Sequence, residues 1–389
     1  MTGYRRGAAF ALACAGMLVF GVVLTSLGAV LPEITERFGV SKAAAGSLFT
    51  LLSFGILVGS LVFGPWVDRA GYRIPLAAGI GIVALGLELL AFGASLAALR
   101  IGVALIGFGG GIVNGGTNAL VADITMENKA AALSLLGVFF GVGAVGVPFA
   151  LGVLTGTVGY TTLLALLGAL AALPLLAPLL TALPAPKQPH SFPLREGLGL
   201  LRERPLLILG AMLFLQSGME ITMGGWSATF AGEELALDAR ASLLFLSLYW
   251  LGMMSARLAL GSLLKHVAPA NAVFACIGIA LVGSLLLLAS RNVALASVGI
   301  FLVGAGFAAG FPVVVGWIGE RYAALSGTAI SIALIMALSG GMLLPYLAGV
   351  LGGAAGLRTS LLIVPLALLG SAMLLVSLRA RRLTGVTAQ

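Results

Sequence analysis

Several polar side chains interrupt the long apolar stretches of this sequence. Glu220 lies within the apolar run 205–230, and Asn114 and Asn118 lie within the glycine-rich stretch 107–123. A carboxyl group in apolar surroundings can bind and release a proton, and side-chain amides can hydrogen-bond hydroxyl groups. Because unpartnered polar groups are costly in such surroundings, we predict that these residues meet other helices or a watery cavity.

Spacing places these groups on defined helix faces. Asn114 and Asn118 are four residues apart and so share one face, and Gln216 precedes Glu220 by one turn. At 1.5 Å per residue, Glu220 lies about 22 Å into its helix, slightly past the middle. Trp226 and Phe311 could add flat aromatic surfaces that contact a solute. We therefore predict a solute site made of Asn114, Asn118, Gln216, Glu220, Trp226 and Phe311. Glu220 is its predicted proton-binding group. The alternatives are helix–helix hydrogen bonds for the amides and Glu220, and interface anchoring for the aromatics.

The composition is that of a membrane protein. The 389 residues are 60% hydrophobic and only 9% charged, too little charge for a soluble surface. We predict an all-α protein with twelve membrane-spanning helices of about 20 residues each. Their expected ranges are 8–31, 44–66, 74–94, 97–122, 130–154, 160–182, 205–230, 241–264, 271–289, 294–318, 326–350 and 358–378.

Several function classes are excluded by what these spans contain. The two cysteines, Cys14 and Cys276, lie in separate apolar runs, and neither histidine lies in a span. The sequence therefore predicts no disulfide framework, no metal site, no cofactor and no enzymatic nucleophile–base pair. The net charge of +8 is spread over loop ends, which indicates membrane orientation rather than nucleic-acid binding.

The chain repeats itself at a shift of 197 residues. Thirteen glycines coincide in this register, including Gly107 with Gly304 and Gly55 with Gly252, where a content of 56 glycines would give about four. The two asparagines coincide with Phe311 and Val315, so the halves share a scaffold without its polar face. We predict two pseudo-symmetric six-helix bundles, 1–183 and 205–389, joined by a proline-rich basic linker, 184–204.

The distribution of basic residues predicts the orientation. Fourteen lysines and arginines flank one side of the predicted membrane and six flank the other. The positive-inside rule then puts both termini in the cytoplasm, in a multi-pass protein of the cytoplasmic (plasma) membrane. The first apolar run is longer than a signal peptide core, so we expect it to remain as the first span.

A motif follows the second predicted span. Residues 64–73 read Gly-Pro-Trp-Val-Asp-Arg-Ala-Gly-Tyr-Arg, which resembles the G-x-x-x-D-R-x-G-x-R signature of the major facilitator superfamily. The resemblance implies a solute transporter that works by alternating access. It also implies that Asp68, Arg69 and Arg73 hold an inner gate closed, and we expect Asp123 to be a partner of one of the arginines.

Four further charges are expected to form two pairs. Glu88 and Arg100 lie six residues either side of a predicted turn near 94, which indicates a structural salt bridge. Arg257 and Glu320 lie near the inner ends of their spans and are expected to form a gate or brace.

Other patches resemble the fucose and glucose permease-like branch of this superfamily. They are 133–143 with Pro148, 218–226, 250–257 and 310–312. The branch implies proton-coupled import of hexoses, and Glu220 is our own candidate for the proton-coupling residue. Two departures are Asn114, where the branch often has a carboxylate, and Ser134, where it often has asparagine.

We therefore expect a secondary active transporter of a small polar solute, most simply a monosaccharide, by proton symport. Its partners are the solute, a proton and the lipid bilayer, with no nucleic acid, and the protein is expected to be a monomer. A proton-driven drug or metabolite efflux antiporter and an uncoupled sugar facilitator are the alternatives. The amides at 114 and 118 favour a polar solute over a lipophilic drug.

Overall fold

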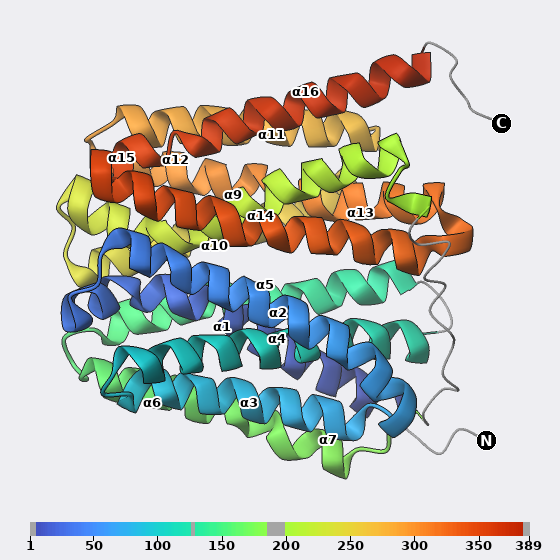
Figure 1. The fold of residues 1–389 in the computed structure, drawn as a ribbon, viewed down its shortest axis with the longest axis horizontal. Coiled ribbons are helices and arrows are strands. Elements are labelled where there is room, and N and C mark those ends of the chain that lie inside the picture. Colours follow the sequence, from blue (N-terminus) through green and yellow to red (C-terminus); the bar gives the residue numbers. More distant parts are fainter. Residues whose placement is uncertain (1–4, 126–128, 185–198, 384–389) are drawn as a thin grey trace. The chain divides into compact units, whose positions relative to one another are not determined.

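The structure is a computed structural model that describes residues 5–125, 129–184 and 199–383, almost all of them helical (Figure 1). The helices before residue 185 are α1 (Arg6–Phe38), α2 (Lys42–Ala70), α3 (Arg73–Phe92), α4 (Leu96–Ile124), α5 (Lys129–Leu154), α6 (Tyr160–Ala172), the 3-10 turn η1 (Leu173–Leu176) and α7 (Ala177–Leu180). Those after residue 198 are α9 (Arg204–Leu235), α10 (Ala239–Leu263), α11 (Pro269–Ala289), α12 (Val293–Gly306), α13 (Gly310–Arg321), η2 (Ala323–Leu325), α14 (Ser326–Ala355), α15 (Leu357–Ser360) and α16 (Ile363–Leu383).

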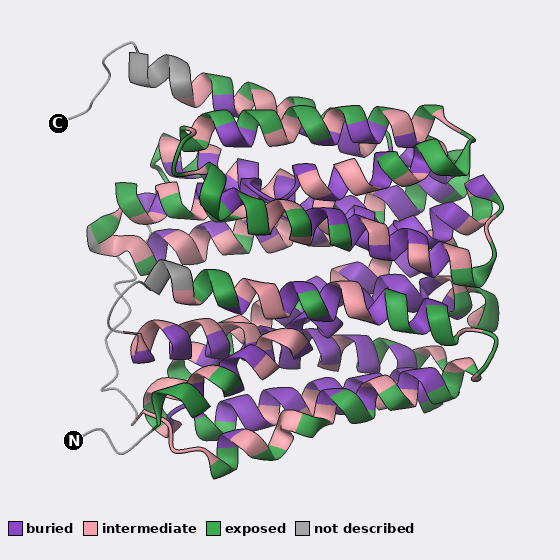
Figure 2. Ribbon diagram, turned by 180° about the vertical axis from the view of Figure 1, so that it is seen from behind, coloured by how far each residue is buried: buried purple, intermediate pink, exposed green. Residues whose placement is uncertain are grey.

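Twelve helical segments within the described residues are long and apolar enough to cross a membrane. The all-α class and the twelve predicted spans are therefore confirmed. Figure 2 shows exposed stretches along the helices. The exposed residues include large apolar ones. Leu180, Leu173 and Met373 are 83%, 75% and 73% exposed. An apolar surface of this kind suits contact with lipid.

The helices pack into two compact units. Unit 1 comprises residues 1–190 and 224–247, and unit 2 comprises residues 191–223 and 248–389. Helices α9 and α10 therefore contribute to both units. The boundaries predicted from the sequence, at 183 and 205, remain a prediction, and most of the predicted linker 184–204 lies outside the described residues.

Glycines permit the closest helix contacts, at equivalent positions in each unit. In unit 1, a Cβ atom on Gly107 of α4 would collide with the Leu52 carbonyl oxygen of α2. In unit 2, a Cβ atom on Gly304 of α12 would collide with the Tyr249 carbonyl oxygen of α10. Gly304 lies 197 residues after Gly107, and Tyr249 lies 197 residues after Leu52. The repeat in the sequence is therefore a repeated backbone contact, which only a residue without a side chain allows.

Side-chain caps begin several helices. The Ser41 and Ser95 hydroxyls accept from the amides of Ala44 and Ala98 at 3.3 and 3.2 Å. The Asp238 carboxylate accepts from the Ala241 amide at 2.7 Å, at the start of α10. Such caps satisfy amides that have no partner within the helix and contribute about 1 kcal/mol each. They fix where the spans begin, and so the depth of the residues inside them.

The tenth span is broken near its middle, and the continuous helix predicted over 294–318 is wrong in this respect. Helix α12 ends at Gly306 and α13 begins at Gly310. Pro312 explains the break, because proline has no amide hydrogen and its ring clashes with the carbonyl four residues earlier. In the first turn of α13 that missing donor costs little. The break leaves backbone carbonyls in the interior of unit 2.

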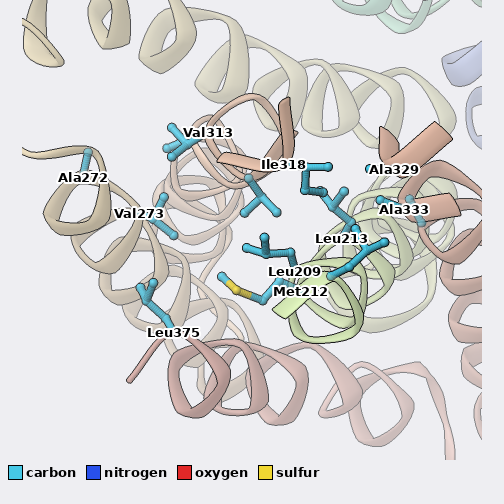
Figure 3. Close-up of a cluster of buried hydrophobic side chains, with 14 of the residues drawn as sticks. Leu209, Met212, Leu213, Ala272, Val273, Val313, Ile318, Ala329, Ala333 and Leu375 are labelled. Carbon is cyan, nitrogen blue, oxygen red and sulfur yellow. The ribbon is translucent and has the colours of Figure 1, made fainter. Parts of the chain in front are cut away.

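A buried apolar cluster holds the second half of this span in place. Figure 3 shows Leu209 and Met212 of α9 close to Ile318 of α13, with Val273 of α11 to their left. All four side chains are buried. The cluster packs α9 against the broken span, nearer the start of α9 than the polar residues described next.

Candidate functional site

Glu220 pairs with Arg257 inside unit 2. The carboxylate Oε1 of Glu220, on α9, lies 3.7 Å from Nη2 of Arg257, on α10. The two side chains are 12% and 29% exposed. This distance allows an ion pair but is too long for a hydrogen bond. An ion pair in these surroundings compensates charges that would be costly alone.

The sequence predicted Glu320, not Glu220, as the partner of Arg257. Glu220 lies fifteen residues before the end of α9, and Arg257 lies eighteen after the start of α10. In adjacent antiparallel helices these two positions lie at nearly the same depth. Counting residues outward from the turn between α9 and α10 would therefore have identified the pair from the sequence. Glu320, near the end of α13, is exposed.

Gln216 links α9 to the broken span. Its Nε2 donates to the Phe307 carbonyl oxygen at 3.1 Å, one of the groups released by the helix break. A Cβ atom on Gly310 would collide with the Gln216 carboxamide oxygen, so glycine leaves room for this side chain. Gln216 therefore secures the break one turn below Glu220. Interrupted helices of this kind carry binding sites in other transporter folds.

Tyr249 is a further residue of this cluster that was not among the site residues predicted from the sequence. Its hydroxyl donates to the backbone carbonyl of Glu220 at 3.2 Å. The ring is fully buried and packs edge-on against Trp250 and Phe307, with centroids 5.0 and 6.2 Å apart. Tyr249 thus ties the backbone at Glu220 to α10 and to the broken span.

The asparagine pair lies on α4, in unit 1. Nδ2 of Asn118 donates to the backbone oxygen of Asn114 at 2.9 Å and to its side-chain Oδ1 at 3.0 Å. Both side chains are partly exposed. In the described part of the chain they form no hydrogen bond to another helix. The pair therefore offers one open donor, Nδ2 of Asn114, and one open acceptor, Oδ1 of Asn118.

The two aromatic residues of the predicted site differ in exposure. Trp226 has no exposed surface and packs against Phe49 within unit 1, with ring centroids 6.2 Å apart. It does not line an open cavity in this structure, contrary to our expectation, because α9 turns its ring into the helix interface. Phe311 is half-buried and packs against the apolar cluster of Figure 3.

Comparison with known families identifies the chain. The family model of the Major Facilitator Superfamily matches residues 11–302, three quarters of the sequence. The chain belongs to the Major Facilitator Superfamily. Its twelve spans are therefore those of a membrane transporter of this superfamily.

Solved structures of superfamily members share the fold at low sequence identity. The nucleoside transporter NupG has a TM-score of 0.78 at 16% identity, covering 96% of this chain and 99% of its own. A D-xylose–proton symporter has a TM-score of 0.78 at 15% identity, covering 94% and 96%. A bacterial homolog of the human lysosomal transporter Spinster, in an inward-facing, unoccupied conformation, has a TM-score of 0.76 at 14% identity, covering 95% and 96%. No curated protein sequence matches the chain.

The superfamily motif closes the turn between α2 and α3. Gly71 ends α2 with φ of 69°, a left-handed conformation that favours glycine, and its amide donates to the Val67 carbonyl oxygen at 2.8 Å. Arg69 and Arg73, on either side, are exposed, and Asp68 is partly buried.

Asp123 has a hydrogen-bond partner that the sequence analysis overlooked. The Tyr72 hydroxyl, inside the motif, donates to Oδ2 of Asp123 at 2.6 Å. Burial, the hydrogen bond to Asp123 and the charge of Asp68 raise the pKa of Tyr72 well above its ordinary value. Tyr72 therefore stays protonated, and remains a donor, throughout the physiological pH range.

The predicted salt bridge between Glu88 and Arg100 is absent from the described residues. The Glu88 carboxylate instead lies against Gly168 of α6, where a Cβ atom would collide with its Oε1. Arg100 is exposed. A count from the turn gives the depth of a residue but not the direction in which its helix face points, and here α3 turns Glu88 toward α6.

Replacing Tyr72 by phenylalanine is expected to lower the melting temperature of the purified protein. The variant keeps the ring but leaves Asp123 without this donor, and a hydrogen bond to a charged group contributes about 1.5–3 kcal/mol. Tyr346→Phe is the matched control, because Tyr346 is exposed on α14. Equal melting temperatures for the two variants would show that the Tyr72–Asp123 bond does not brace this end of unit 1.

Proposed function

We propose that this transporter carries a small polar solute, most simply a monosaccharide, together with protons. The observation that carries the proposal is Glu220, a mostly buried carboxylate in the middle of a span, loosely paired with Arg257. An ionisable residue at this depth is functional by default, because its burial has to be compensated. A carboxylate that exchanges between a proton and an arginine is a simple coupling device.

The asparagine pair of α4 supports a polar solute. Its open donor and acceptor suit the hydroxyl groups of a sugar, and Phe311 offers an aromatic surface in unit 2. The resemblance to the fucose and glucose permease-like branch and the fold shared with a D-xylose–proton symporter favour the same class.

A nucleoside is the second candidate solute. The fold is equally similar to a nucleoside transporter, and the same amides would suit ribose hydroxyls and base edges. A drug efflux antiporter is less well supported, because the half-exposed amides make the α4 surface polar. We further propose that the protein is a monomer of the cytoplasmic membrane. The distribution of its basic residues supports an orientation with both termini inside the cell.

The solute class is tested by counterflow in proteoliposomes. Protein reconstituted with an internal pool of D-glucose, D-xylose or uridine is given the same solute in labelled form. Saturable counterflow of a monosaccharide supports the proposal, and counterflow of uridine alone supports the nucleoside alternative. If none of the three moves, the proposed solute class is wrong.

Asn118→Leu is expected to raise the KM for the solute about five- to tenfold, with little change in melting temperature. Leucine keeps the approximate size but removes the open acceptor and the bonds to Asn114, and one hydrogen bond is worth about 0.5–1.5 kcal/mol. The control is Asn271→Leu, an exposed position on α11. An unchanged KM in Asn118→Leu would assign the amides to helix packing alone.

A further inference from the structure

A cavity lies within unit 1, at the end opposite the superfamily motif. It has a volume of about 540 Å³ and is walled by the ends of α1, α5, α6, α9 and α10. That size is in the range of small-molecule sites, roughly 300–1,000 Å³. None of the residues assigned above to the solute or the proton lines it, so it is a separate feature of the protein.

The cavity has a strongly negative wall. Glu33, Glu36 and Glu233 line it, and its lining residues, all of them described, include no lysine or arginine. Only Glu233 is neutralised, by Lys42, whose Nζ lies 2.5 Å from Oε2. Arg37 is directed elsewhere, since its guanidinium donates to the backbone oxygens of Ala91 and Gly93 at 3.5 and 3.3 Å. Two carboxylates therefore remain without an ion pair in the described part of the chain.

Two hydroxyl groups on the same wall lack partners. Thr229, on α9, is only 6% exposed, and its Oγ1 forms no hydrogen bond. The hydroxyl of Tyr160, at the start of α6, is buried and also forms none. Both residues line the cavity. Buried hydroxyls without partners are rare in folded proteins, and each requires an explanation. A ligand in the cavity would provide one.

We propose that this cavity binds a small organic cation. Its ammonium group would lie between Glu33 and Glu36, and a polar group at its other end would bond the hydroxyls of Thr229 and Tyr160. An organic cation fits better than a metal ion for two reasons. The described residues contain no group of three side chains placed to hold a metal, and the cavity walls include Val30 and Leu163, which suit a hydrocarbon chain.

The proposal is tested on the full-length protein in lipid nanodiscs with 4-aminobutan-1-ol as the probe. The neutral probe is 1,4-butanediol, which has the same length without the charge. We expect the amine, but not the diol, to raise the melting temperature in a saturable manner. We also expect its Kd to rise with salt, because Glu33 and Glu36 are exposed. Equal effects of amine and diol, or a Kd that is independent of salt, would overturn the proposal.

Variants then locate the binding. Glu33→Gln is expected to raise the Kd of the amine about tenfold, as for the loss of one charge-assisted hydrogen bond, and Thr229→Val is expected to raise it less. Glu234→Gln is the control, because it removes the same charge from the end of α9, beside the lining residue Glu233, without itself lining the cavity. An equal Kd for Glu33→Gln and Glu234→Gln would assign the effect to surface charge. Glu220→Gln should bind the amine normally, which separates this site from the proposed coupling residue.

Discussion

Replacing Glu220 by glutamine is expected to abolish proton-driven accumulation of the solute while counterflow continues. Glutamine has the same size but cannot release a proton, and counterflow requires no net proton transfer. In proteoliposomes under an imposed proton gradient, the initial rate of accumulation should fall by at least about tenfold, to the rate that wild type shows without a gradient. Labelled monosaccharide uptake measures this directly.

Two further variants make the result interpretable. Glu203→Gln removes an exposed carboxylate just before α9 and should accumulate solute as wild type does. Glu220→Gln/Arg257→Gln removes the whole pair, so no buried charge loses its partner, and it should restore any stability that the single variant lost. Normal gradient-driven accumulation by Glu220→Gln would remove Glu220 from the coupling mechanism.

Replacing Gly304 by alanine is expected to destabilise the protein. The added methyl group would meet the Tyr249 carbonyl oxygen, a backbone atom that can move away only if α10 and α12 separate. Overpacking of this kind costs roughly 1–3 kcal/mol. We expect the melting temperature in detergent to fall by several degrees. Because Tyr249 also bonds the backbone of Glu220, transport should fall with it.

The control substitution is not expected to lower the melting temperature. Gly278, on α11, has no neighbouring atom within 4 Å of its ideal Cβ position, so alanine fits there. Gly278→Ala should leave the melting temperature unchanged or raise it slightly, since alanine favours a helix over glycine. The repeat predicts that Gly107→Ala behaves as Gly304→Ala does. If Gly107→Ala and Gly304→Ala were as stable as Gly278→Ala, the duplicated contact would not hold the helices together.

The fold was predictable because the bilayer leaves few alternatives. A chain of this hydrophobicity must satisfy its backbone hydrogen bonds within each span, so apolar runs of sufficient length become helices. The register of 197 residues was also readable, because glycine is required wherever two backbones touch, as at Gly107 and Gly304. Superfamily membership followed from the motif around Asp68, a local signal.

The candidate site was less predictable because it depends on how each helix is rotated and bent. Trp226 was expected in a cavity but faces Phe49, and Glu88 was expected to meet Arg100 but lies against α6. The apolar composition of the spans does not fix their rotation, since nearly every face is apolar. The break after Gly306 also escaped prediction, although Pro312 was a signal for it.

The most direct test of proton-coupled solute transport is the pH of a weakly buffered medium around proteoliposomes when solute is added. Symport predicts that the medium becomes alkaline, because each solute molecule carries protons inward, and that Glu220→Gln abolishes the change. Acidification of the medium would indicate antiport. Counterflow without any change in pH would show an uncoupled facilitator and would contradict the role proposed for Glu220.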